Sequence, residues 1–237
     1  MNIRKKLIII IAIVAVIGIL ALVYGLFLSN PELASGDKTV LVLAVDESEP
    51  RLGLGAVDMA YVVYLKDGNI DKSVPIYPGG LRHPSKAEPA EAQAQGAGAM
   101  MLLHDALWTS NNDEGMQNAR EIVEHNTGME VDAVVAITTE GLDAIIDAAG
   151  GIKINGTLTD MRAVDLLREE QNERGVSRGG AVSNLANVLL KSAQDPSKRG
   201  AMTQAALAQF AAGNIVASPT GSFASLIAYK GLGAITG

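Results

Sequence analysis

The sequence predicts an α/β fold, a three-layer α/β/α sandwich around a mixed sheet, preceded by one transmembrane helix. Two near-continuous apolar segments, Val40–Val45 and Met59–Leu65, have the length and composition of strands that are buried on both faces. A later apolar strand segment alternates with helical patterns, which is typical of α/β domains. A charge-free apolar run at the N-terminus is long enough to cross a bilayer.

This N-terminal run is Leu7–Leu28, and it exceeds the roughly 20 residues that a membrane span needs. A cleaved signal peptide is the alternative, but its apolar region usually has only about 7–15 residues, and residues 29–35 contain no clear A-x-A cleavage site. Arg4, Lys5 and Lys6 precede the run. The positive-inside rule therefore predicts a single-pass plasma-membrane protein with a cytoplasmic N-terminus and an extracytoplasmic domain.

Composition excludes several classes of function. The net charge is −7, and the part after the apolar run is more acidic still, because three of the 19 basic residues precede it. This charge argues against a nucleic-acid partner. Because the chain has no cysteine, it has no disulfide, thiolate nucleophile, Cys-ligated metal or lipoprotein acylation site.

The chain divides into five parts by composition. We expect a cytoplasmic stub (1–6), the transmembrane helix (7–28), a linker (29–38), the extracytoplasmic domain (39–213) and a small-residue tail (214–237). The tail is too short and too polar for a second membrane span.

Two acidic residues mark the ends of the first two strands. Asp46 closes the first and Asp58 opens the second, so the loop between them brings both carboxylates to one rim of the sheet. Ligands of α/β proteins bind at such rims. Asp67-Gly68 predicts a hairpin into a third strand, Ile70–Tyr77, whose end then lies beside Asp58.

The loop after this third strand is expected near the same rim, and it contains Arg82, His83 and Lys86. The remaining elements are mostly helical. The sequence predicts helices over 90–107 and from Asn112 to a cap at Gly128, a strand–helix–strand unit over 131–154, and helices over 159–170, 183–193 and 196–212.

The stretches LVLAVDESEP, GAVDMAYVVYL, VPIYPGG and VDAVVAITTEGLDAIIDAAGGIKING resemble the LytR-CpsA-Psr family. They resemble even more its uncharacterised prokaryotic relatives, archaeal ones included. The resemblance implies an extracytoplasmic enzyme that transfers polyprenyl-pyrophosphate-linked glycopolymers to a cell-envelope acceptor. It implies that Asp46 and Asp58 are the catalytic acids and bind Mg²⁺. Turns in which these two acids accept backbone N–H groups are the alternative interpretation.

The resemblance also implies arginines that neutralise the pyrophosphate and a cavity for the lipid. The chain departs from the family pattern: Ala56-Val57-Asp58 stands where the family has Arg-Ser-Asp, and Pro78-Gly79-Gly80 stands where it has Pro-Arg-Asp. The expected phosphate-binding residues are Arg82, His83 and Lys86, which could replace the missing arginines, with Arg168 from the later segment. A solvated loop is the alternative interpretation of the first three. The expected lipid pocket contains Ala97, Gly98, Met100 and Met101, for which ordinary core packing is the alternative interpretation.

Three functions remain open from the sequence. The first is a Mg²⁺-dependent glycopolymer phosphotransferase, and the second is a non-catalytic envelope binding or scaffold module that kept the fold and lost the arginine-based phosphate site. The third is a structural partner of membrane proteins that binds through the tail. Asn155-Gly156-Thr157 is a glycosylation sequon. The three histidines are too widely spaced for a zinc pair, and no G-x-S-x-G motif is present.

Overall fold

The computed structural model describes residues 32–49, 51–154, 157–159, 162, 188–189, 191–192 and 195–227. Several predicted features lie outside these residues. They are the membrane helix Leu7–Leu28, the Asn155 sequon, Arg168, most of the predicted helices 159–170 and 183–193, and the tail from residue 228. Among the helices within the described ranges, none combines the length and the apolar composition that a membrane span requires.

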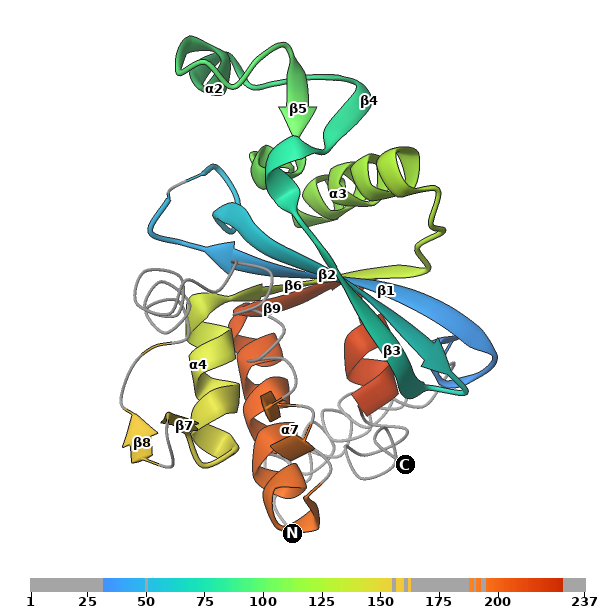
Figure 1. Ribbon diagram of the computed structural model, residues 1–237, viewed down its shortest axis with the longest axis vertical. Helices are drawn as coiled ribbons and strands as arrows, with labels where there is room; N and C mark the ends of the chain where they lie inside the picture. Colours follow the sequence, from blue (N-terminus) through green and yellow to red (C-terminus); the bar gives the residue numbers. More distant parts are fainter. Residues whose placement is uncertain are drawn as a thin grey trace, which may run out of the picture.

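A five-stranded sheet with the order β3-β2-β1-β6-β9 forms the centre of the domain (Figure 1). Its strands are β1 (Asp37–Asp46), β2 (Ala56–Lys66), β3 (Asn69–Ile76), β6 (Ala133–Thr138) and β9 (Ile215–Ser218). β1 is antiparallel to β2 and parallel to β6. The expected α/β fold with a mixed sheet is therefore confirmed, as are the first three strands.

The hairpin between β2 and β3 follows from its turn residues. Asp67 and Gly68 have φ angles of 49° and 73°, as a type I′ turn requires. The resulting register places Ile76, the last residue of β3, opposite Ala60. The end of β3 thus lies close to Asp58, as the hairpin predicted.

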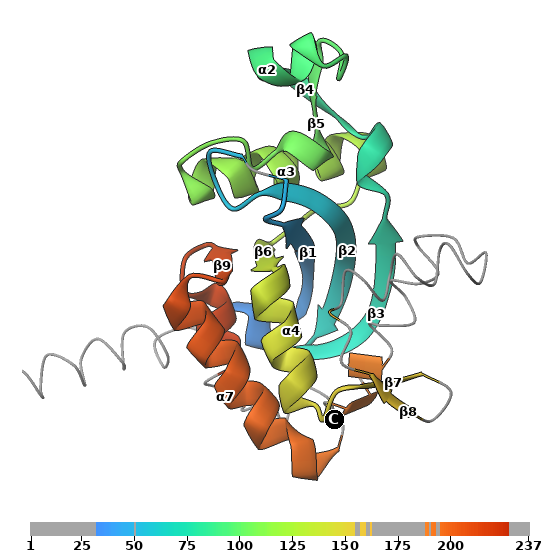
Figure 2. The same ribbon diagram turned by 90° about the vertical axis from the view of Figure 1, so that its left-hand side faces the viewer.

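Helices cover both faces of this sheet (Figures 1 and 2). α3 (Asn112–Thr127) packs on one face, where Met116, Ala119 and Ile122 join a core with strand residues such as Leu41 and Leu43. α4 (Thr139–Ala148) and α7 (Pro196–Ala212) lie on the other face over a second apolar core. The helix starts are capped by side chains of Asn111, Thr138 and Asp195.

Residues 90–107 do not form the single helix that the sequence predicted. They form a short helix, α2 (Ala90–Ala94), a strand, β5 (Met100–Leu102), and a 3₁₀ turn, η3 (Leu103–Asp105). Gly96 and Gly98 have φ angles of 91° and 99°, so the chain leaves the helical conformation there.

The predicted loop after β3 is also partly regular. Pro78–Gly80 forms a 3₁₀ turn, η2, and Arg82–Ala87 forms β4, which pairs with β5 in a small antiparallel sheet. We call residues 82–102 the β4–β5 lobe. It projects beyond α3, away from the central sheet (Figure 1).

The predicted strand–helix–strand unit over 131–154 is correct in its elements but wrong in its pairing. β7 (Ile152–Ile154) pairs with β8 (Thr157–Thr159) outside the central sheet, and β9 occupies the position beside β6. Gly150 and Gly151 have φ angles of 88° and 75° and redirect the chain after α4. Thr159, where the sequence predicted the start of a helix, is the last residue of β8. β9 extends the sheet beyond residue 213, the predicted end of the domain.

Candidate functional site

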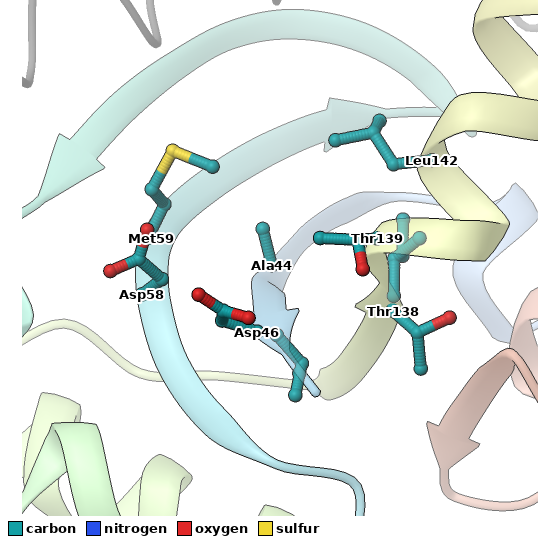
Figure 3. A pocket seen from close by; sticks show the side chains of 9 residues that line it. Ala44, Asp46, Asp58, Met59, Thr138, Thr139 and Leu142 are labelled. Atoms are coloured by element: carbon teal, nitrogen blue, oxygen red, sulfur yellow. The ribbon is translucent and has the colours of Figure 1, made fainter. Parts of the chain in front are cut away.

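Asp46 and Asp58 line one small pocket at the rim of the central sheet (Figure 3). Asp46 is the last residue of β1, and Asp58 lies near the start of β2. The other lining residues are Ala44, Val45, Met59, Ile137, Thr138, Thr139 and Leu142. The pocket volume of about 10 Å³ is close to the space of one water molecule. The structure thus brings the two predicted acids together.

A β-bulge sets the direction of Asp58. Ala44 of β1 stands opposite Met59, and the next residue, Val45, stands opposite Val57, so Asp58 is the extra residue of β2. Val57 is fully buried in the core on the α3 side. Because a bulge changes the alternation of side chains, Asp58 faces the pocket on the α4 side.

Ser48 orients the carboxylate of Asp46, which is 4% exposed. Oδ1 of Asp46 accepts hydrogen bonds from the backbone N–H of Ser48 at 2.8 Å and from its Oγ at 2.6 Å. An aspartate followed two residues later by a serine is the usual pattern of such a turn. This D-x-S pattern was a signal that our sequence analysis did not use.

Glu47 connects the loop after β1 to the N-terminus of α4. Its carboxylate accepts hydrogen bonds from the backbone N–H of Thr139 at 2.9 Å, from that of Glu140 at 3.4 Å, and from Thr139 Oγ1. Partial burial raises the pKa of Glu47, but these hydrogen bonds together with one from its own backbone N–H outweigh that effect and lower the pKa. A negative charge therefore stays at the positive end of the helix.

The three basic residues predicted from the loop after β3 have partners away from this pocket. Arg82 donates to the backbone oxygens of Met100 and Ala97, the latter at 2.8 Å. Lys86 Nζ donates to Asn118 Oδ1 at 2.6 Å and to Glu114 Oε1 at 3.1 Å, both on α3.

His83 is buried, with 1% of its side chain exposed. Its Nδ1 accepts hydrogen bonds from the backbone N–H groups of Ser85 and Lys86 at 3.1 and 2.9 Å. Since Nδ1 accepts, Nε2 carries the proton and faces Glu121 Oε2 at 2.9 Å. The 3₁₀ turn at Pro78–Gly80 leads this segment onto α3, whereas the pocket faces α4. The structure does not bring Arg82, His83 and Lys86 to the acid pair.

The residues expected to hold a lipid lie in the β4–β5 lobe. Met101 is 8% exposed and belongs to the core on the α3 side, which is the alternative that the sequence left open. A Cβ on Gly98 would lie 3.1 Å from the guanidinium nitrogens of Arg82, so this glycine permits the close approach of Arg82. Ala97 and Met100 provide the backbone oxygens that Arg82 binds.

A larger apolar cavity lies next to α7, on the face of the sheet opposite to α3. Its volume is about 250 Å³, and all of its described lining residues are apolar. They are Leu33, Val40, Val42, Val63, Leu65, Ile70, Val135, Ile137, Ile145, Met202, Ala206, Phe223, Leu226 and Ile227. These residues come from many separate segments, so no local sequence pattern revealed the cavity.

The cavity and the acid pair share one face of the sheet. Val40 and Val42 of β1 line the cavity, and Ala44 and Asp46, further along the same strand, line the pocket. Ile137 of β6 contributes to both. Four residues of a strand span about 13 Å, which separates the apolar lining at Val42 from the carboxylate at Asp46.

The donor set of the pocket fits Mg²⁺. Magnesium is usually bound by one or two carboxylates together with water and substrate phosphates, and Asp46 and Asp58 provide two. Within the described residues, no group of three or more histidine or acidic side chains is arranged to hold a metal on its own. A metal at this site would therefore depend on ligands from water or substrate.

Comparison with known proteins identifies the fold. The model of a family described as a protein of unknown function, DUF4012, matches residues 35–171. The structure of a LytR-Csp2A-Psr enzyme from Actinomyces oris has a TM-score of 0.53 at 16% identity, over 85% of this chain and 76% of that one. No curated protein matches the sequence.

Two further structures are similar. TagV of B. subtilis has a TM-score of 0.52 at 16% identity, with 85% of this chain and 81% of that one covered. TagT bound to LIIa-WTA has a TM-score of 0.52 at 12% identity, with coverage of 90% and 79%. At these identities the similarity shows the fold. The expectation of a LytR-CpsA-Psr-like domain, nearer to uncharacterised relatives, is confirmed.

Proposed function

Because this chain belongs to the DUF4012 family of unknown function and has a LytR-CpsA-Psr-like fold, we propose that it binds a polyprenyl-(pyro)phosphate-linked glycan and transfers the glycan to a cell-envelope acceptor. The complex of TagT with LIIa-WTA, in a protein of the same fold, supports a lipid-linked glycan as the ligand. In this proposal Leu7–Leu28 anchors the chain in the plasma membrane, with the domain outside.

The main support for this proposal is that the acid pair and the apolar cavity lie on the same face of the sheet. A prenyl pyrophosphate has an apolar chain attached directly to a strongly anionic group. The cavity of about 250 Å³ would hold the beginning of the chain between the sheet and α7, and the pyrophosphate would lie near the rim at Asp46 and Asp58. The apolar lining excludes water from the chain, which favours its binding.

The charge of the pyrophosphate has to be neutralised at this rim. Among the described residues that line the pocket, none is basic. Mg²⁺, when bound, neutralises phosphate oxygens and the carboxylates, which otherwise repel each other. Asp46 and Asp58 would hold the ion, and Ser48 keeps the Asp46 carboxylate in place.

In the proposed reaction an acceptor hydroxyl forms a bond to the phosphorus that carries the glycan, and the bond from that phosphorus to the prenyl phosphate breaks. The products are the phosphodiester-linked glycan and prenyl phosphate, and the hydroxyl proton is released to solvent. The residues Asp46, Asp58 and Ser48 contribute position and charge in this step.

A non-catalytic binding module is the second candidate. It is favoured by the positions of Arg82, His83 and Lys86, which are engaged with the β4–β5 lobe and α3. Such a module would use the apolar cavity and would not need the acid pair for binding.

Calorimetric titration of the full-length protein in detergent tests the proposal. The ligands are farnesyl pyrophosphate, farnesol and inorganic pyrophosphate, each with and without Mg²⁺. We expect farnesyl pyrophosphate to bind in a Mg²⁺-dependent way and more tightly than either fragment. Equal binding of farnesol and farnesyl pyrophosphate, independent of Mg²⁺, would support the binding module instead.

A further inference from the structure

Two buried carboxyl groups meet between the β4–β5 lobe and the rest of the domain. Glu88 follows β4, and Asp105 ends η3; they are 2% and 3% exposed. They lie within hydrogen-bonding reach of each other. Neither residue belongs to the pocket at Asp46 and Asp58, and buried carboxylates at such positions need partners.

The contacts of Glu88 are incomplete if it is ionised. Its Oε2 accepts a hydrogen bond from the backbone N–H of Leu102 at 2.6 Å. Its Oε1 is buried and has no hydrogen-bond partner among the described residues. Two ionised carboxylates only accept hydrogen bonds, so they cannot satisfy each other. One proton on Oε1 would provide the missing donor toward Asp105.

Asp105 has its own cationic partner. Its Oδ1 accepts a hydrogen bond from Arg51 Nε at 3.0 Å, and the guanidinium of Arg51 stacks on Trp108 at 4.4 Å. Glu88, whose buried Oε1 has no donor within the described part of the chain, is therefore the member of the pair that takes the proton. Among the described residues, Arg82 from β4 also acts on Glu88, while His104 from η3 and Glu49 from the loop between β1 and β2 contact Arg51.

Glu88 also fixes the conformation of the lobe. Its backbone N–H donates to Ala99 O at 3.0 Å, and its backbone oxygen accepts from Gln93 Nε2 at 2.7 Å. Together with the bond from Leu102, these contacts join the two strands of the lobe across α2. The base of the lobe is held separately, because His83 and Lys86 contact α3.

We propose that Glu88 and Asp105 share one proton and form a pH-sensitive clasp that closes the β4–β5 lobe onto η3. Burial is the main reason that the pKa of Glu88 is raised, to about 7; Asp105 raises it further, while the Leu102 N–H and Arg82 lower it. Below this pH the clasp is closed. Above it, two like charges face each other in a buried site, and residues 88–102 loosen.

Hydrogen–deuterium exchange of the full-length protein in detergent tests the clasp, with rates corrected for intrinsic exchange. Between pH 6 and pH 8, protection of residues 88–102 in the wild type should fall by about tenfold, because the folded state loses its proton in this range. Glu88→Gln keeps a donor toward Asp105 at every pH, so its protection should be constant. Glu91→Gln removes an exposed carboxylate of the same lobe and should behave as the wild type.

Infrared spectroscopy of the wild type provides a second test that does not depend on a variant. A protonated buried carboxyl should be visible at pH 6 and should disappear with a midpoint near pH 7. Wild-type protection that is constant from pH 6 to 8, the same fall in Glu88→Gln, or no protonated carboxyl at pH 6 would each overturn the proposal.

Discussion

Asp46 and Asp58 face the same pocket because β2 contains one residue more than β1 at this point. Val45 stands opposite Val57, Ala44 stands opposite Met59, and Asp58 is the residue between. Because of the bulge, Val57 packs in the core on the α3 side and Asp58 faces the pocket on the α4 side. A proposed metal site thus arises from a local irregularity of two otherwise regular strands.

Ser48 is expected to act as a positioning residue for this site. Ser48→Ala removes the hydrogen bond from Oγ to Asp46 and leaves the backbone bond, so stability should fall by about 1 kcal/mol or less. Mg²⁺ affinity, measured by calorimetry in the presence of pyrophosphate, should fall by about three- to tenfold. This loss corresponds to the free energy of the one hydrogen bond that is removed. Ser73→Ala, at an exposed position of β3, is the control and should change neither quantity. Unchanged Mg²⁺ affinity in Ser48→Ala would show that Asp46 does not need this support.

Glu47 should stabilise the folded state through α4. Its pKa is lowered, so the stabilisation is fully present above the ordinary pKa of 4.5 and is lost as the pH falls through the lowered value. Glu47→Gln should therefore lose about 0.5 to 1 kcal/mol at pH 7. Thermal unfolding at pH 7 and at pH 3 compares the two proteins, and the difference should shrink at the lower pH. A difference of the same size at both pH values would mean that charge is not the cause.

Filling the apolar cavity should block the prenyl chain. Ala206 on α7 is buried and lines the cavity, so Ala206→Phe places a large side chain where the chain would lie. Farnesyl pyrophosphate should bind at least about tenfold more weakly, a loss of about 1.4 kcal/mol. Ala208→Phe adds the same side chain at an exposed position of the same helix and should bind as the wild type. Equal affinity of both variants would place the lipid elsewhere.

Lys86 should not contribute to ligand binding at the acid pair. Its ammonium group contacts Asn118 and Glu114 on α3, in a partly exposed ion pair. Lys86→Ala should change stability by at most about 1 kcal/mol and should leave pyrophosphate affinity within about twofold of the wild type. Calorimetry with Mg²⁺ and pyrophosphate measures this. A large loss of affinity would show instead that Lys86 binds phosphate, as the sequence analysis expected.

The sequence predicted the parts of the fold that local patterns determine. The apolar runs predicted β1 and β2, Asp67-Gly68 predicted the hairpin, and the cap at Gly128 predicted the end of α3. That the two acids lie at one rim could be predicted because Asp46 ends β1 and Asp58 lies near the start of β2.

The remaining features depend on contacts between distant segments. β4 and β5 are short and polar or glycine-flanked, and each is a strand only because it pairs with the other. β9 is four residues long and is held by β6. The positions of Arg82, His83 and Lys86 follow from the turn at Pro78–Gly80, whose direction no spacing rule determines. The apolar cavity combines residues from both ends of the domain.

Thermal unfolding of the full-length protein with Mg²⁺ and farnesyl pyrophosphate, beside the double variant Asp46→Asn Asp58→Asn, tests the central claim most directly. A ligand at a hundredfold excess over its Kd stabilises the folded state by about 2.7 kcal/mol. We expect a Mg²⁺-dependent rise in the unfolding temperature of the wild type that is absent in the variant. A rise of the same size in both proteins, or none in the wild type, would contradict a metal-assisted pyrophosphate site at Asp46 and Asp58.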